Sequence, residues 1–261
     1  MQTLFSDLQS NKLTLQIREI FTNVFANIWT RIIVLPILIL SLLAATAATA
    51  YSQAAILTPR EVVEYALTLE KLEAEFYRQA FVAMNGGGLA SLPKPAKQAI
   101  RSYGEDEAIH VPDLAVILKS LGGNPDDITI TANPNFNAVI GRDPFANPQD
   151  FLLALQNVED TGVAAYKGQV QNLLAAGPEF KAVLAGALEI HSIEARHAAG
   201  VRAIRQKFYN VDVRPWIRKA KEVPFRKSSK DSAIPFGNEA FDAPATKDQV
   251  LAIVGPILAG K

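Results

Sequence analysis

The sequence predicts an all-α fold, a four-helix bundle with one long crossover connection. Four segments repeat apolar residues at the three- and four-residue spacing of amphipathic helices, and they lie within about residues 58–85, 91–121, 147–176 and 177–209. Short turns separate the first pair and the last pair, whereas about 26 residues lie between the second and third helices. Short, long and short connections in this order are typical of a bundle with a single crossover.

The composition of the 261-residue chain is that of a folded protein with one extra segment. It is 49% hydrophobic and 20% charged, and 26 Lys and Arg balance 26 Asp and Glu. A net charge of zero provides no overall field for nucleic acid, and the apolar content excludes a disordered chain. Because the chain has no cysteine, disulfides, thiolate zinc sites and cysteine nucleophiles are excluded. Carboxylate and imidazole groups remain as candidate metal ligands.

Residues 1–54 are predicted to be a signal peptide or a membrane anchor. No charged residue occurs at 32–59, and a dense apolar run begins directly after Arg31. The small residues at 44–50 provide a cleavage site of the Ala-x-Ala type, so a mature chain is expected to begin between residues 51 and 55. We therefore expect export to the periplasm or the extracellular space. An uncleaved anchor, with membrane contact through this segment, is the alternative.

The bundle domain is predicted to span residues 55–209, and its helices have recognisable start and stop signals. The starts are the capping box Thr58-Pro59-Arg60-Glu61, then Pro93, Asn147-Pro148 and Gly177-Pro178, and the first two helices stop at Gly86-Gly87-Gly88 and Gly122-Gly123. The segment 122–147 contains four Asn-Pro or Asp-Pro turn signals and is expected to be the crossover. At ~3.3 Å per residue it can travel the ~40 Å length of a bundle, as a link between two parallel helices requires.

Charged residues interrupt the inward apolar stripe near the middle of each helix. They are Glu70 in the first helix, Glu107 and His110 in the second, Glu159 in the third, and Glu194 and His197 in the fourth. The second and fourth helices thus each present a Glu-x-x-His pair on one face. Burying such groups without partners costs several kcal/mol, so something must compensate them.

The positions of these residues along the bundle agree with one another. Glu70 and Glu107 each lie about 15 residues from the first turn, and Glu159 and Glu194 lie about 17 and 16 residues from the second. At ~1.5 Å per residue all four are level to within one helical turn. The two halves also repeat each other, because a tyrosine follows both Glu70 and Glu159 by seven residues. The sequence therefore predicts that these side chains converge.

This arrangement resembles the ferritin-like superfamily of dinuclear carboxylate proteins, over about residues 58–208. The resemblance implies two divalent ions, iron or manganese. It implies that Glu70 and Glu159 are terminal carboxylates, that Glu107 and Glu194 are bridges, and that His110 and His197 supply one imidazole per metal. Four carboxylates would offset two divalent charges, whereas without metal they would repel one another and take up protons.

Three segments look most like the exported branch of that superfamily, which includes desiccation- and stress-related proteins. They are 69–77, 193–198 and 240–254, which read LEKLEAEFY, IEARHA and AFDAPATKDQVLAIV. The catalytic residues of such a protein are not indicated by the sequence, and the resemblance implies only its metal ligands.

Some candidate residues have rivals. Glu73 and Glu75 share the helix of Glu70. Glu70 is favoured as the ligand by its position along the bundle axis and by the tyrosine that follows it by seven residues. His191, on the stripe of Glu194, is interpreted as a hydrogen-bonded histidine of the core or in support of the site, with a role as a ligand as the alternative. Tyr77 and Tyr166 are interpreted as core aromatic residues whose hydroxyl groups bond toward the site, with a redox role as the alternative. Pro112 predicts either a kink or a wide turn in the second helix.

Residues 210–261 are predicted to form an irregular C-terminal tail with one short helix from Thr246 to Val254, before Gly255-Pro256. Its basic first part is typical of a solvated surface.

Three functions remain open at this point. One is redox chemistry of a di-metal oxidoreductase with O₂ or peroxide, of the ferroxidase or peroxide-removing type. The second is a non-catalytic stress or desiccation role in which the metals are mainly structural. The third is a structural or interaction module that uses the tail and the crossover. The partners expected are metal ions and small oxidants rather than nucleic acid, and the sequence leaves the oligomeric state open.

Overall fold

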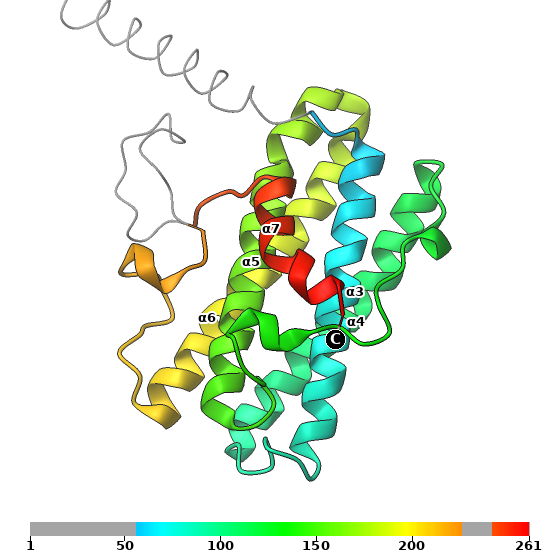
Figure 1. Cartoon of the computed structure of the whole chain (residues 1–261). Helices are drawn as coiled ribbons and strands as arrows, with labels where there is room; N and C mark the ends of the chain where they lie inside the picture. Colours follow the sequence, from blue (N-terminus) through cyan, green and yellow to red (C-terminus); the bar gives the residue numbers. More distant parts are fainter. Residues whose placement is uncertain (1–55, 226–241, 261) are drawn as a thin grey trace, which may run out of the picture. The chain divides into compact units, whose positions relative to one another are not determined.

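A computed structural model describes residues 56–225 and 242–260, so the predicted signal or anchor segment lies outside the described residues. Within these ranges the secondary structure is helical, without strands. Four long helices form the bundle in Figure 1: α3 (Pro59–Met84), α4 (Lys94–Ser120), α5 (Pro148–Ala176) and α6 (Lys181–Tyr209). The all-α prediction is confirmed.

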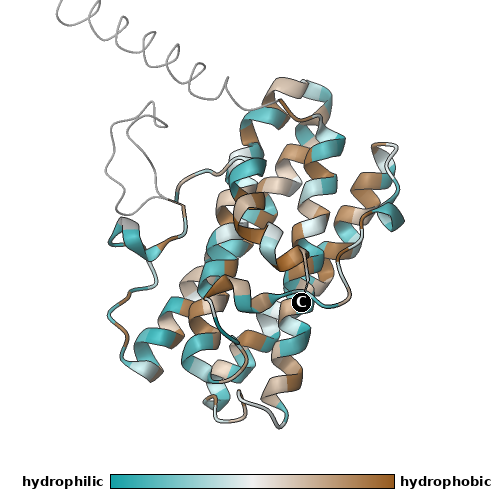
Figure 2. Cartoon of the chain, viewed as in Figure 1, coloured by the Kyte–Doolittle hydropathy of each residue, from teal (hydrophilic) through white to brown (hydrophobic). Residues whose placement is uncertain are grey.

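The helices pack as two antiparallel hairpins. α3 contacts α4 and α5 contacts α6, while α3 also contacts α5 and α4 also contacts α6. The crossover runs beside the bundle, so α4 and α5 point the same way (Figure 1). Hydrophobic and hydrophilic residues alternate along each helix in Figure 2, as expected when one face of each helix is buried.

Local sequence explains where the helices begin. The Thr58 side chain accepts a hydrogen bond from the Glu61 N–H, and the Glu61 carboxylate accepts one from the Thr58 N–H, as a capping box requires. The Asn147 side chain caps α5 by accepting hydrogen bonds from the N–H groups of Gln149 and Asp150. α6 is preceded by one 3₁₀ turn, η4 (Pro178–Phe180), rather than following directly on Gly177.

The crossover is tied to the bundle although it contains only two short 3₁₀ turns, η2 (Pro125–Asp127) and η3 (Phe136–Val139). Phe136 lies edge-on to Phe76, with their ring centroids 5.0 Å apart. Lys71 of α3 donates hydrogen bonds to the carbonyl groups of Pro125 and Ile128. These contacts fix the long connection against α3.

The C-terminal helix is longer than predicted. α7 (Lys247–Leu258) continues through Gly255 and Pro256, so the prediction that it ends at Val254 was wrong. Val250, Val254 and Ile257 are all buried, and the burial of Ile257 explains why the helix continues despite the hydrogen bond that Pro256 cannot donate.

The tail reaches the bundle at several points. A 3₁₀ turn, η5, spans Ala220–Glu222, and the Glu222 carbonyl accepts hydrogen bonds from Gln156 of α5 and Arg202 of α6. Further on, the Ala245 N–H donates to the Ala164 carbonyl. A Cβ atom on Gly168 would lie 1.8 Å from the Ala245 oxygen, so only glycine lets the tail approach α5 here.

α4 is α-helical throughout, and Pro112 produces no wide turn in it.

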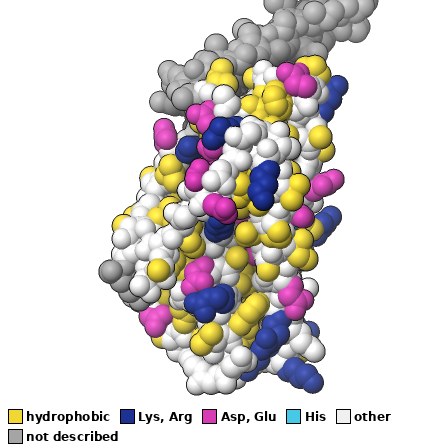
Figure 3. Space-filling view, turned by 90° about the vertical axis from the view of Figure 1, so that its right-hand side faces the viewer, with side chains coloured by type: hydrophobic (Ala, Val, Ile, Leu, Met, Phe, Trp, Pro, Cys, Tyr) yellow, Lys and Arg dark blue, Asp and Glu magenta, His cyan; other side chains and the backbone are white. Residues whose placement is uncertain are grey.

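On the face shown in Figure 3, Lys and Arg side chains are interspersed with Asp and Glu, so neither sign gathers in one patch. Among the described residues, no helix combines the length and the hydrophobicity needed to cross a membrane.

Candidate metal centre

Each helix of the bundle buries at least one glutamate near its middle. Glu70, Glu107 and Glu194 are 0% exposed, and Glu159 is 1% exposed. They come from α3, α4, α6 and α5 respectively, so the four-helix packing brings four acids from distant parts of the sequence into one interior. Four carboxylates without compensation would be strongly destabilising there.

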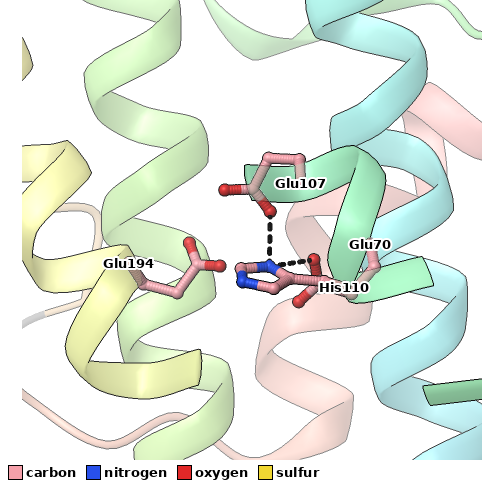
Figure 4. Close-up of side chains that lie close together, drawn as sticks. All are labelled: Glu70, Glu107, His110 and Glu194. Carbon is pink, nitrogen blue, oxygen red and sulfur yellow. Dashed lines mark hydrogen bonds and ion pairs between the residues drawn. The ribbon is translucent and has the colours of Figure 1, made fainter. Parts of the chain in front are cut away.

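The first group of potential ligands consists of Glu70, Glu107, His110 and Glu194. One donor atom from each lies within 4.8 Å of all the others. The Nδ1 atom of His110 is 3.1 Å from Glu70 Oε2 and 3.0 Å from Glu107 Oε2. Figure 4 shows these contacts, with the Glu194 carboxylate pointing toward the imidazole from the opposite side.

The second group consists of Glu107, Glu159 and His197, whose donor atoms also lie within 4.8 Å of one another. His197 Nδ1 is 2.8 Å from Glu107 Oε1 and 3.3 Å from Glu159 Oε2, yet it makes no well-oriented hydrogen bond to either. Its other nitrogen, Nε2, is 3.0 Å from Oδ2 of Asp106. Asp106 therefore orients the ring and leaves Nδ1 free to face the carboxylates.

All six residues predicted as ligands thus lie in these two groups. Glu107 belongs to both, which is the position of a carboxylate that bridges two ions. Glu194, the other expected bridge, belongs to the first group.

Tyr77 and Tyr166 each contact a glutamate on the other helical hairpin. Tyr77 of α3 donates a hydrogen bond to Glu159 Oε1 of α5, and Tyr166 of α5 donates one to Glu70 Oε1 of α3. Burial and neighbouring carboxylates raise the pKa of both phenols well above the ordinary value, so both stay protonated and act as donors. Each hydroxyl fixes one oxygen of the carboxylate that it contacts.

A fifth carboxylate also faces the site. Glu73 is 7% exposed, and its Oε2 has no hydrogen-bond partner among the described residues. Sequence reasoning weighed Glu73 only as a rival of Glu70, whereas the structure turns both inward because residues three apart share a helix face. Glu75, the other rival, forms an ion pair with Arg78 on the surface.

Glycine at position 162 makes room for the Glu194 carboxylate and, less closely, for that of Glu73. A Cβ atom there would lie 2.4 Å from Glu194 Oε2 and 3.3 Å from Glu73 Oε1. Gly162 follows Glu159 by three residues, as Glu73 follows Glu70, so the two halves differ at this matched position. The spacing was visible in the sequence, but the inward direction of Glu73 was not.

His191 does not join either group of ligands. It is half-buried, and its Nε2 atom is a buried nitrogen without a hydrogen-bond partner among the described residues. Burial lowers its pKa, with a further contribution from the positive charge of Lys167. The structure therefore gives no contact through which His191 would support the site.

The pKa values of the buried glutamates are shifted in different directions. Burial raises the pKa of Glu70 to about 8 and that of Glu194 well above its ordinary value. Burial also acts on Glu107, but the hydrogen bond with His110 and the close imidazole of His197 outweigh it and lower the pKa to about 2. The same contacts raise the pKa of His110 to about 10 and that of His197 to about 11, against the effect of burial.

The residues present fit a pair of cations. Buried oxygens of Glu73, Glu107, Glu159 and Glu194 and the His197 Nδ1 have no hydrogen-bond partner in the described part of the chain. Oxygen and imidazole donors in this proportion suit iron and manganese, and bound cations would replace the protons that the acids otherwise hold.

The family model described as a ferritin-like domain matches residues 58–207. This match covers more than half of the chain, and the chain therefore belongs to the ferritin-like domain family. A search of curated proteins found no match, and a search of solved structures found none either.

Proposed function

We propose that the protein binds two divalent ions, iron or manganese, and uses them in redox chemistry with O₂ or peroxide, of the ferroxidase or peroxide-removing type. The observation on which this rests is that Glu107 belongs to both ligand groups. A carboxylate shared between two clusters is the arrangement by which two cations are held close together.

In this proposal one ion is held by Glu70, Glu107, His110 and Glu194, and the other by Glu107, Glu159 and His197. The bound metals would supply the change of oxidation state that O₂ or peroxide requires. The protein's own groups hold the ligands in place: Tyr77 and Tyr166 each fix a carboxylate oxygen, and Asp106 fixes the His197 ring. Glu73, whose pKa is raised by burial, can hold a proton on Oε2 beside them.

Elemental analysis and stopped-flow assays test the proposal. Purified protein is expected to contain about two metal ions per chain and to oxidise Fe(II) or consume hydrogen peroxide faster than buffer does. Glu107→Ala is expected to hold neither ion, because the bridge serves both. A variant that still holds two metals per chain would refute the shared-carboxylate assignment.

A second function, a structural metal site in a stress- or desiccation-related protein, is favoured by the burial of the ligands. The glutamates of both groups are at most 1% exposed, so direct access from solvent to the centre is small. Removal of the metal that melts the bundle, together with no turnover of Fe(II) or peroxide, would support this function over the first.

We also propose that the protein is exported, because an apolar segment followed by small residues precedes residue 55 in the sequence. N-terminal sequencing of protein from the native host is expected to begin between residues 51 and 55. A native chain that starts at residue 1 would contradict cleavage.

A further inference from the structure

A cavity of about 480 Å³ lies between α3 and α5, where η3, α7 and the tail also contribute to its walls. Representative lining residues are Leu72 of α3, Val158 of α5, Phe136 of η3, Val254 of α7 and Val223 of the tail. Figure 1 shows α7 lying across α5 at this side of the bundle. The volume is within the ~300–1,000 Å³ range of small-molecule sites.

The inner wall of the cavity is also a wall of the metal centre. Glu73 and Gly162 both line the cavity, and Gly162 lies directly against the carboxylate of Glu194. Because Gly162 has no side chain, only backbone separates the cavity from Glu194 at this point. A molecule in the cavity would therefore lie next to the first ligand group.

The cavity is mainly apolar, and its polar lining side chains are those of Glu73, Asn157, Thr161, Lys221 and Glu222. Aliphatic and aromatic side chains make up most of the lining. The Thr161 hydroxyl already donates to the Asn157 carbonyl, and the Glu222 carboxylate accepts from the Arg218 N–H. The Glu73 carboxyl group lines the cavity and makes no hydrogen bond among the described residues, so it is the group to which a ligand hydroxyl would bond.

We propose that this cavity binds a small, uncharged, mainly apolar organic molecule that carries one hydroxyl group, such as an alkylphenol. Its hydroxyl bonds to the Glu73 carboxyl group and its hydrocarbon part contacts the apolar walls. A charged molecule is disfavoured because most of the lining is apolar, and the lining cation, Lys221, is exposed to solvent. A phenol can donate to a carboxylate or accept from a carboxylic acid, so the pairing holds in either protonation state of Glu73.

This binding goes beyond the proposed redox function and requires no metal. The test uses 4-propylphenol and propylbenzene, which differ by the hydroxyl group, titrated into the purified protein by calorimetry. Both are measured after chelation of metal and again after loading with Mn(II). We expect the phenol to bind at least tenfold more tightly than the hydrocarbon, and Glu73→Leu to abolish this preference. Equal binding of the two probes, or no binding of the phenol, would overturn the proposal.

A second pair of variants locates the site. Ile253 lines the cavity and is 37% exposed, so Ile253→Trp would fill the opening from the surface. Val116→Trp is the matched control, because Val116 is 68% exposed on α4 and does not line the cavity. Ile253→Trp is expected to weaken phenol binding at least tenfold and Val116→Trp to leave it unchanged. Phenol binding that survives Ile253→Trp would show that the probe binds elsewhere.

Failure of the two proposals can be told apart. If the metal assignment is wrong, the protein retains no iron or manganese but still binds the phenol after chelation. If the cavity assignment is wrong, metal content is normal and the phenol shows no preference over the hydrocarbon.

Discussion

Gly162 of α5 lies directly against the carboxylate of Glu194 on α6: a Cβ atom at position 162 would be 2.4 Å from Glu194 Oε2. A real Cβ atom cannot approach an oxygen so closely, so the glutamate keeps its place only because residue 162 has no side chain. The position of one potential ligand thus depends on the absence of a side chain at residue 162.

Replacing Gly162 is expected to weaken metal binding without unfolding the bundle. In Gly162→Ala the new methyl group pushes the flexible Glu194 carboxylate aside, and we expect Mn(II) affinity, measured by calorimetry, to fall roughly 10–100-fold. Gly186→Ala on α6 is the control, because its Cβ would lie 3.9 Å from Ile117 Cδ1, an ordinary contact. Unchanged affinity in Gly162→Ala would show that Glu194 is not a ligand.

The tyrosine hydroxyls are expected to matter for affinity more than for folding. Tyr166→Phe removes the donor to Glu70, and Tyr77→Phe removes the donor to Glu159. Each leaves a buried oxygen unpaired, at about 1–3 kcal/mol of unfolding free energy in the metal-free protein. We expect each to lower Mn(II) affinity roughly tenfold or more.

The control for these variants is Tyr65→Phe. The Tyr65 hydroxyl is buried but has no partner among the described residues, so its removal should leave stability and metal affinity unchanged or slightly improved. Chemical denaturation and calorimetry on the three variants provide the comparison. Equal effects from all three would mean that loss of a hydroxyl, rather than of a contact to the site, is responsible.

Asp106 was not singled out in the sequence, yet it contacts Nε2 of His197. Asp106→Ala frees the imidazole to rotate, and we expect Mn(II) affinity to fall roughly 10–100-fold with little change in the unfolding midpoint. Glu105→Ala, at the exposed neighbouring position, is expected to have no effect. An affinity in Asp106→Ala equal to that of the control would show that the contact does not orient the ring.

The metal-free protein is expected to lose stability as pH rises. Burial raises the pKa of Glu70 from 4.5 to about 8, so between these values the folded state keeps a proton that the unfolded chain releases. Hydrogen bonds to Glu107 and Glu70, outweighing burial, raise the pKa of His110 from 6.5 to about 10, which extends the same effect to higher pH. Since the folded state binds more protons throughout this window, the free energy of unfolding falls by up to about 1.4 kcal/mol per pH unit for each group.

Thermal unfolding at pH 5.5 and 8.5 checks this sign. The midpoint of the dialysed, metal-free protein should be lower at pH 8.5. The Mn(II)-loaded protein should show the opposite trend or none, because metal replaces the protons and binds more tightly as pH rises. A metal-free midpoint that rises with pH would contradict the protonation pattern assigned to the site.

The bundle could be predicted because its signals are local. The capping box at Thr58 and the Asn147-Pro148 start fix helix boundaries through hydrogen bonds within a few residues. The end of α7 could not be read in this way, because Gly255-Pro256 is a stop signal that the burial of Ile257 overrides. That burial depends on distant parts of the chain.

Much of the site could be predicted as well, for a geometric reason. Glu107 and His110 share a face by spacing, and equal distances from the turns bring them level with Glu70. Spacing does not say which of two acids on one stripe turns inward, so Glu73 was set aside. Nor does it show a contact between helices, such as that of Asp106 with His197, which depends on how α4 and α6 pack.

The exchange of tyrosines makes the two helical hairpins depend on each other. The α3–α4 hairpin obtains the hydroxyl for Glu70 from α5, and the α5–α6 hairpin obtains the hydroxyl for Glu159 from α3. One hairpin expressed alone would therefore leave its own glutamate oxygen without a donor. The two hairpins must therefore associate before either carboxylate gains its hydroxyl donor.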